Sequence, residues 1–385
     1  MSEYQYYEFL AVDRHLTQQQ MGELRAYSSR ARITPGSFVN VYNWGSFKGD
    51  PDKWMEKYFD AFLYLANWRS RWFMLRVPKQ LLDPDIASTY CTGENLTCRT
   101  KGDHLILSLY SEVEDFDSSD GEGCLGSLVP LRSDLMRGDV RCLYLAWLLS
   151  AQKGEFDDET IEPPVPPGLG ELSAPLRSLA DFLRIDLDWI AAAAERSKEG
   201  PASGLSNEDI SRWVARLPSK DKDTVLVRLL GSDDPHIAAE LKQPALSETR
   251  GEEDSGRGSR SSVPRSVGQL VARAEAIAEE RRKKEAEQRA RERARREREQ
   301  AEKSRKHLES LVGKESGLWA RVDKLIATRQ PKQYDEAVSI LQDLHDLAEM
   351  RGKGSEFSRR MNELHSQHTK KTSLLERFRK AKLLE

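Results

Sequence analysis

Residues 281–306 restrict the fold of this chain more than any other segment, because they combine dense charge with a lack of large apolar side chains. Of these 26 residues, 13 are Lys or Arg, 6 are Glu and only four are Ala. No Pro interrupts residues 267–330, so the pattern predicts one long charged helix over that range. A helix of that length would measure roughly 95 Å at 1.5 Å per residue.

This helix is expected to stand without a partner helix. A coiled coil buries large apolar residues at its a and d positions, and the central segment lacks them. Residues 279–306 have instead seven Glu residues that each precede a Lys or Arg by four positions, an arrangement that stabilises an isolated helix by about 0.2–0.5 kcal/mol per pair. We therefore favour a solvated, self-supporting helix over the dimer seam of a coiled coil. The seven pairs are Glu279–Lys283, Glu280–Lys284, Glu285–Arg289, Glu287–Arg291, Glu292–Arg296, Glu299–Lys303 and Glu302–Lys306.

The two parts of the chain carry opposite charge. The formal net charge of the 385 residues is -3. Residues 251–385 contain 32 Lys and Arg against 24 Asp and Glu, a net charge of +8, which leaves -11 for residues 1–250. Such an asymmetry bears on the partners of a protein and on its solubility, and it does not determine the fold.

Residues 1–160 are predicted to form an α+β domain. Four segments rich in aromatic and aliphatic residues are typical of strands. Thr17, with Gln20 three residues later, forms the capping box of a first helix. A second helix begins with Pro51 at its first position, and the apolar spacing extends it through Tyr58 to Ala66. A last helix covers 131–152. The four expected strands are 4–12, 37–44, 72–77 and 105–110.

The rest of the chain is predicted to be helical. Residues 161–243 begin with the proline-rich stretch 162–168, which favours polyproline II and is typical of a stiff connector, and continue as a small all-helical domain. Residues 244–266 are rich in Ser, Gly, Arg and Glu and indicate a flexible linker. After the long helix 267–330, Pro331 begins a C-terminal helical segment, 331–385. The expected fold class is thus an α+β N-terminal domain followed by an all-α domain, a long charged α-helix and a C-terminal helical bundle.

Two parts of the sequence resemble known bacterial families. Three stretches resemble a bacterial family without an assigned function, a resemblance that covers about residues 1–240. The tail 334–377 resembles the helical ending of bacterial SWIM-type zinc-finger proteins, but it lacks that family's Cys-x-Cys and Cys-x-His signature, so the zinc and nucleic-acid roles do not carry over. The resemblance implies a bacterial, cytoplasmic protein. The first three stretches are Tyr27-Ser-Ser-Arg-Ala-Arg-Ile-Thr-Pro35, Tyr58-Phe-Asp-Ala-Phe-Leu-Tyr-Leu-Ala-Asn67 and Glu162-Pro-Pro-Val-Pro-Pro-Gly-Leu-Gly170.

No motif for catalysis or cofactor binding stands out. The sequence has no phosphate-binding P-loop, no His-Glu-x-x-His and no Gly-x-Ser-x-Gly. The spacing of Cys91 and Cys98 is too wide for a usual structural zinc pair. The acidic loop 112–122 fails the calcium-loop pattern and is interpreted as a solvated hairpin loop. His365 and His368 are interpreted as a surface pair. We therefore expect no catalytic, cofactor-binding or metal-binding residues.

The basic part of the long helix is the strongest functional signal. Its net charge of +7 over residues 281–306 suits attraction to a phosphate backbone, and its lack of aromatic residues excludes base stacking. We favour a non-enzymatic multidomain adaptor or accessory subunit in the bacterial cytoplasm, with a protein partner and no membrane. The alternatives are weak, non-specific nucleic-acid binding, or an enzyme with its site in residues 1–150. The candidate nucleic-acid-binding residues are Arg281, Arg282, Lys283, Lys284, Arg289, Arg291, Arg293, Arg295, Arg296 and Arg298.

Overall fold

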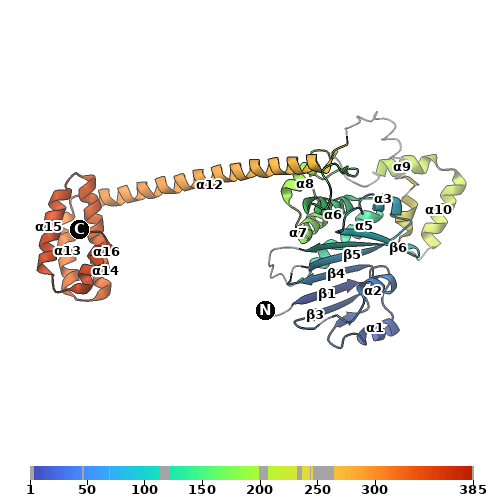
Figure 1. The fold of residues 1–385 in the computed structure, drawn as a ribbon, viewed down its shortest axis with the longest axis horizontal. Coiled ribbons are helices and arrows are strands. Elements are labelled where there is room, and N and C mark those ends of the chain that lie inside the picture. The colour runs from blue at the N-terminus through green and yellow to red at the C-terminus, as the bar shows by residue number, and fades with distance from the viewer. Residues whose placement is uncertain are drawn as a thin grey trace. The chain divides into compact units, whose positions relative to one another are not determined.

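The computed structural model describes most of the chain (Figure 1). The described residues are 4–45, 47–68, 70–112, 121–198, 207–231, 236–242, 244–245 and 264–383. They belong to two compact units, Met1–Arg281 and Arg282–Glu385, called unit 1 and unit 2 below. Each unit has its own hydrophobic core, and one helix passes from the first into the second.

A seven-stranded antiparallel sheet forms the centre of unit 1, with strand order β2-β3-β1-β4-β5-β7-β6. Successive side chains of a strand point to opposite faces of the sheet, and most strands here carry apolar residues on both faces. The sheet therefore has a buried layer on both sides. The strands are β1 (Gln5–Leu10), β2 (Arg32–Thr34), β3 (Ser37–Tyr42), β4 (Ala61–Ala66), β5 (Ser70–Pro78), β6 (Leu96–Lys101) and β7 (His104–Glu112).

Helices cover the two faces of the sheet unequally (Figure 1). The first face packs against six helices, whose leucines and alanines form the larger core. The second face is partly covered by two helices and carries an aromatic core that includes Phe9, Phe38 and Trp54. The helices of the larger core are α3 (Pro84–Ser88), α4 (Cys124–Leu128), α5 (Pro130–Met136), α6 (Arg141–Gln152), α7 (Ala174–Leu183) and α8 (Leu187–Ala194). Those of the second face are α1 (Gln18–Arg25) and α2 (Pro51–Lys57).

The prediction of one helix from Pro51 to Ala66 is wrong in its second half. Helix α2 starts at Pro51 with Asp50 as its cap, as expected, but it ends at Lys57. Residues 61–66 form the central strand β4, paired on both sides with β1 and β5. A strand buried on both faces is a continuous apolar run, and periodicity alone does not distinguish such a run from a buried helix.

The predicted helix over 131–152 is also divided in the structure. Helix α5 ends at Met136 and α6 begins at Arg141. Gly138 has a φ of 82°, a left-handed conformation that glycine adopts without a Cβ clash. The buried carboxylate of Asp139 then accepts hydrogen bonds from the guanidinium of Arg141. The chain therefore changes direction at this glycine and starts a new helix.

Two further helices, α9 (Asn207–Arg216) and α10 (Ser219–Gly231), follow α8. Most of the predicted flexible linker 244–266 lies outside the described residues. At its C-terminal end the chain is packed, because Arg265 is only 5% exposed. Residue Ser266 forms an isolated β-bridge with Ile161.

The long charged helix is shorter than predicted. Helix α12 spans Val267–Leu311, 45 residues, and Gly313, with a φ of 81°, separates it from α13 (Glu315–Ala327). The core of unit 2 lies within α13 and the three helices that follow it, and includes Trp319, Leu341 and Phe378. These three are α14 (Pro331–Met350), α15 (Gly354–Gln367) and α16 (Thr372–Lys380). The predicted fold class is confirmed, since an antiparallel sheet domain precedes helical regions, a long helix and C-terminal helices.

Candidate functional site

The first turns of α12 belong to the core of unit 1. Leu270 is fully buried, and Val267 and Ala274 are almost so. These three residues recur at spacings of three and four, so they place one face of the helix against unit 1. The charged helix is thus anchored by apolar contacts at its N-terminal end.

A buried ion pair precedes this anchor. The guanidinium of Arg265 donates from Nε to Oε2 of Glu162 at 2.7 Å and from Nη2 to Oε1 at 2.6 Å. Its Nη1 donates to the carbonyl of Ala192 at 2.8 Å. The hydroxyl of Tyr144 also donates to Glu162. We call Arg265, Glu162 and Tyr144 the anchor cluster, and it joins the chain before α12 to the proline-rich connector.

Two partly exposed ion pairs extend the attachment along α12. Arg273 pairs with Glu195 through Nη2 and Oε1 at 2.6 Å. Arg281 pairs with Asp188 through Nη2 and Oδ2 at 2.8 Å. The structure therefore places Arg281, a predicted nucleic-acid-binding residue, in contact with α8.

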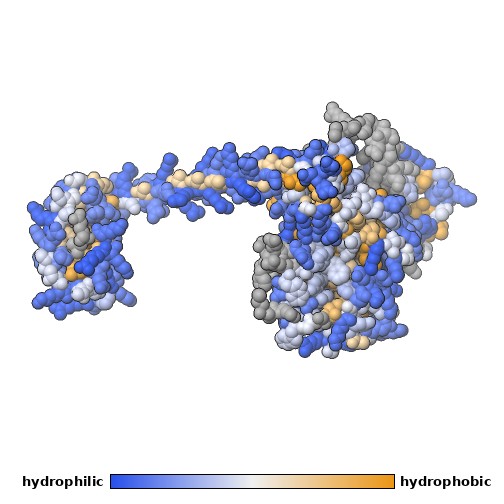
Figure 2. Space-filling view, viewed as in Figure 1, coloured by the Kyte–Doolittle hydropathy of each residue, from blue (hydrophilic) through white to orange (hydrophobic). Residues whose placement is uncertain are grey.

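Beyond these pairs, every residue from Ala286 to His307 is exposed. Hydrophilic side chains surround this part of α12 apart from a narrow apolar line (Figure 2). Of the seven predicted pairs, Glu285–Arg289 is seen at 3.8 Å and Glu302–Lys306 at 2.8 Å. Other pairs have the cation first, such as Arg293–Glu297 at 2.9 Å.

The helical periodicity brings some of the predicted residues together. Among residues 282–307, at about 100° per residue, a sector of about 60° contains Arg282, Arg289, Arg293 and Arg296 together with Gln300 and His307, and it contains no Glu. We call these four arginines the arginine face. The side chains of Arg289 and Arg293 are 83% and 82% exposed. The remaining predicted residues of α12 lie on other sides of the helix: Lys283, Lys284, Arg291, Arg295 and Arg298.

A buried charge network in residues 1–150 was not predicted from the sequence. Asp60 is fully buried, and its Oδ1 accepts from Nη2 of Arg76 at 2.6 Å. Its Oδ2 accepts from the backbone N–H groups of Val12 and Asp13. Arg132 holds both carboxylate oxygens of Asp13, at 2.7 and 2.5 Å. The network connects β4, β5 and α5 with the loop that follows β1.

Histidines adjoin this network. His236 Nε2 lies 2.9 Å from Asp13 Oδ2. Burial raises the pKa of Asp13, but hydrogen bonds from Arg132 and His236 outweigh it, so this pKa lies below its usual range. Burial and the nearby Arg76 lower the pKa of His104. Each carboxylate of the network already binds a cation, which is typical of a structural network in a folded core.

The second face of the sheet carries an open aromatic row. Tyr64 of β4, Trp72 of β5 and Tyr110 of β7 are directly opposite one another in the strand register. All three side chains are half-buried. The next residue on this face of β7, Glu112, is exposed. This row combines flat aromatic surface with a carboxylate, and it could not be predicted from the sequence because its members lie on three separate strands.

The cysteine pair, the acidic loop and the histidine pair are the candidate metal sites considered in the sequence analysis. The thiols of Cys91 and Cys98 share a hydrogen bond, and both cysteines are free. Most of the acidic loop 112–122 lies outside the described residues. His365 and His368 are at the end of α15. Within the described ranges, no group of three or more His, Cys, Asp or Glu side chains is placed to hold a metal ion.

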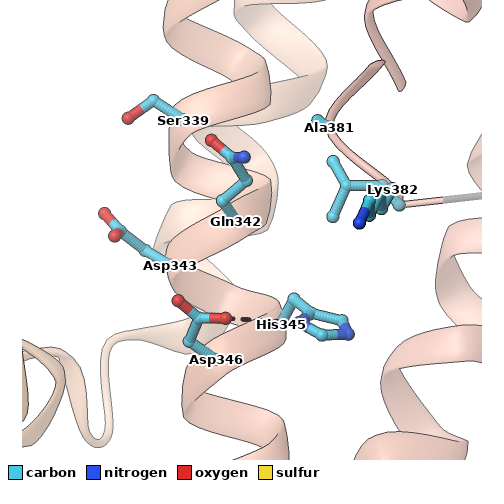
Figure 3. Close-up of a pocket in the computed structure, with 8 residues that line it drawn as sticks. Ser339, Gln342, Asp343, His345, Asp346, Ala381 and Lys382 are labelled. Carbon is cyan, nitrogen blue, oxygen red and sulfur yellow. Dashed lines mark hydrogen bonds and ion pairs between the residues drawn. The ribbon is translucent and has the colours of Figure 1, made fainter. Parts of the chain in front are cut away.

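Unit 2 contains a polar cavity of about 460 Å³ beside α14. His345 Nδ1 lies 3.3 Å from Asp346 Oδ1, and the end of the chain at Lys382 forms the opposite wall. In Figure 3, Ser339 and Asp343 point away from His345. The polar groups of this cavity therefore do not converge on one point.

Comparison with known proteins gave no relatives for this chain: no protein-family model, curated protein or solved structure matches it. Among the helices that the structure describes, none is both long and apolar enough to cross a membrane.

Proposed function

We propose that this chain is a non-enzymatic adaptor or accessory subunit of a bacterial protein assembly, acting in the cytoplasm. The observation that carries the proposal is a charged helix that starts in one folded core and leads into a second, independently packed one. A protein that brings two partners together needs two folded binding units and a link between them. Both units and the link are built into this chain.

The properties of α12 favour a linking role. Residues 286–307 bury nothing, so they add little to the hydrophobic stability of either unit. Their intrahelical ion pairs stabilise the helical conformation itself. The anchor cluster fixes the start of the link to unit 1, which lets a straight helix transmit position and orientation.

The arginine face supports a second function, weak and sequence-independent nucleic-acid binding. Its four arginines are aligned on one side of the helix. Arg289 and Arg293 are ion-paired with Glu285 and Glu297 but remain highly exposed, so the face is able to contact the phosphates of one backbone. Four contacts correspond to a slope of about -3.6 in log K against log salt on duplex DNA. The helix has no aromatic residue for reading bases, and such binding would carry no sequence preference.

Two variants of the full-length chain separate these functions. The first deletes residues 286–303, which removes about five helical turns and keeps the helical phase. The second replaces the arginine face with glutamine (R282Q, R289Q, R293Q and R296Q) and keeps the length. Affinity capture with the tagged wild-type chain is expected to recover a stoichiometric protein partner on each unit.

The adaptor function predicts that the shortened variant still binds each partner but no longer assembles both, whereas the glutamine variant assembles them normally. Loss of assembly in the glutamine variant, together with loss of salt-dependent DNA binding, would favour the nucleic-acid function. Failure of the wild-type chain to retain any partner would contradict the adaptor function.

A further inference from the structure

The aromatic row on the second face of the sheet is only partly covered. Helix α2 packs against β4 and β5, and its Trp54, together with the ring of Phe47, also covers Phe9 of β1. The rings of Tyr64, Trp72 and Tyr110, on β4, β5 and β7, remain half-buried. Trp68, in the turn that joins β4 to β5, is 45% exposed. Aromatic side chains left open on a folded surface are characteristic of binding sites.

Internal contacts hold the rings of this row in place. Trp72 donates from Nε1 to the hydroxyl of Ser108 at 2.7 Å, and its ring meets Phe62 edge-on at a centroid distance of 5.2 Å. The hydroxyl of Tyr110 donates to Oε1 of Glu112 at 2.9 Å. Burial raises the pKa of Tyr110, so its hydroxyl stays protonated at neutral pH. A ligand therefore meets preorganised rings and loses less entropy on binding.

The charges around the row favour a cationic ligand. Glu112 is exposed at the end of the row. The ammonium of Lys153 interacts with the negative charges of both Glu112 and Glu155, and it donates to Oδ1 of Asn95 at 2.9 Å. Lys153 is therefore already engaged, and the exposed carboxylate of Glu112 is available to a cationic ligand.

Two basic groups elsewhere on this face, both on β6, are already engaged. Arg99 pairs with Asp52 of α2 at 2.7 Å, and Lys101 pairs with Glu56 at 3.3 Å. A stacking platform for single-stranded nucleic acid requires a positive groove, which the described residues of this row do not form. A guanidinium or ammonium group placed over Trp or Tyr is instead attracted by the ring face.

We propose that the aromatic row, Tyr64, Trp72 and Tyr110 with Glu112, binds an extended arginine-rich segment of a partner protein. Arginine side chains would stack on the rings, and one would pair with Glu112. This inference rests on the proposed adaptor function and names the chemistry of the partner that unit 1 recognises.

The test measures fluorescence anisotropy of a labelled ten-residue peptide of alternating Arg and Gly against full-length protein at low salt. Matched probes are the corresponding Glu-Gly peptide and an oligothymidine. All three probes are also titrated against a full-length variant that carries the glutamine-substituted arginine face. The Arg-Gly peptide is expected to bind this variant, and the two anionic probes are expected to bind it at least tenfold more weakly than the Arg-Gly peptide does. Equal or tighter binding of oligothymidine to that variant would overturn the inference.

Two substitutions locate the site. Glu112→Gln, at an exposed position, should weaken the peptide by about 2–5-fold, the value of one surface ion pair. Trp72→Leu should weaken it by about 2–5-fold through loss of the cation–π contact, with circular dichroism confirming the fold. Glu171→Gln is the matched control, because Glu171 is exposed and lies away from the row.

If Glu171→Gln weakens peptide binding as much as Glu112→Gln does, the peptide responds only to the overall negative charge of unit 1, and the inference fails. Unchanged affinity in Glu112→Gln would also overturn it. Either failure leaves the adaptor function standing if affinity capture still recovers a partner on each unit, so the two results are distinguishable.

Discussion

Breaking the anchor cluster should detach the start of α12 from unit 1. Arg265 and Glu162 are 5% and 3% exposed at their side chains and share two hydrogen bonds of 2.6 and 2.7 Å. In Glu162→Gln the guanidinium stays buried but loses its counter-charge and one of its two side-chain acceptor oxygens, and it keeps the carbonyl of Ala192 and the single amide oxygen at position 162 as acceptors. Removing one partner of a buried pair costs about 3–5 kcal/mol. That loss is comparable to the stability of many whole domains, so the segment around Arg265 should open.

Amide hydrogen exchange of the full-length chain is the suitable assay, because a chain of two units need not unfold in one step. We expect exchange of the amides of Val267, Gly268 and Leu270 to quicken by about two orders of magnitude or more, given a factor of ten per 1.4 kcal/mol. Glu195→Gln, which breaks the exposed pair with Arg273, is the matched control and should change exchange by less than about fivefold. Equal effects of the two substitutions would refute the reasoning that burial makes the anchor cluster strong.

Three further outcomes follow from the same structure. Because the pKa of Asp13 is depressed in the folded state, its stabilising contribution is present above the unfolded pKa of about 3.9 and is lost as the pH falls below it. Near-ultraviolet circular dichroism should therefore show acid loss of unit 1 packing below about pH 4, and Asp13→Asn should weaken this packing even at pH 7, with less further loss in acid. Leu270→Ala should destabilise the α12 anchor by about 2–5 kcal/mol, seen as faster cleavage near residue 270 by a protease, whereas Ala290→Gly in the exposed helix should cost only about 1 kcal/mol. Gly138→Ala should lower the melting temperature, since a left-handed φ of 82° costs a residue with a Cβ about 1–2 kcal/mol; an unchanged melting temperature would show that the turn relaxes freely.

Local sequence signals predicted much of the fold. The strand 105–110 is an apolar run bounded by the turn at Gly102-Asp103 and by an acidic segment, and the structure has β7 over His104–Glu112. The start of α2 follows from Asp50 as a cap and Pro51 at the first position. Strand β6, Leu96–Lys101, was missed because its sequence is mostly polar, as suits a strand at the edge of a sheet.

Features that depend on residues far apart in the sequence could not be predicted. Residues 61–66 were wrongly predicted to be helical, because only the pairing of β4 with β1 and β5 makes that apolar run a strand. Among the candidate sites, the basic helix was visible because charge spacing is a local property. Tyr64, Trp72 and Tyr110 come together only through the register of the sheet.

The anchor cluster explains how a helix that buries almost nothing along its exposed part becomes a useful structural element. Intrahelical ion pairs stabilise the helical conformation of residues 286–307. Such a helix has a defined direction relative to unit 1 only if its first turns are packed against that unit. Glu162 lies 103 residues before Arg265 in the sequence, and the ion pair between them joins the proline-rich connector to the residues just before α12. A stiff connector and a stiff helix, joined by a buried ion pair, leave few free dihedrals at the junction. The buried ion pair therefore holds the first turns of α12 in a fixed position on unit 1.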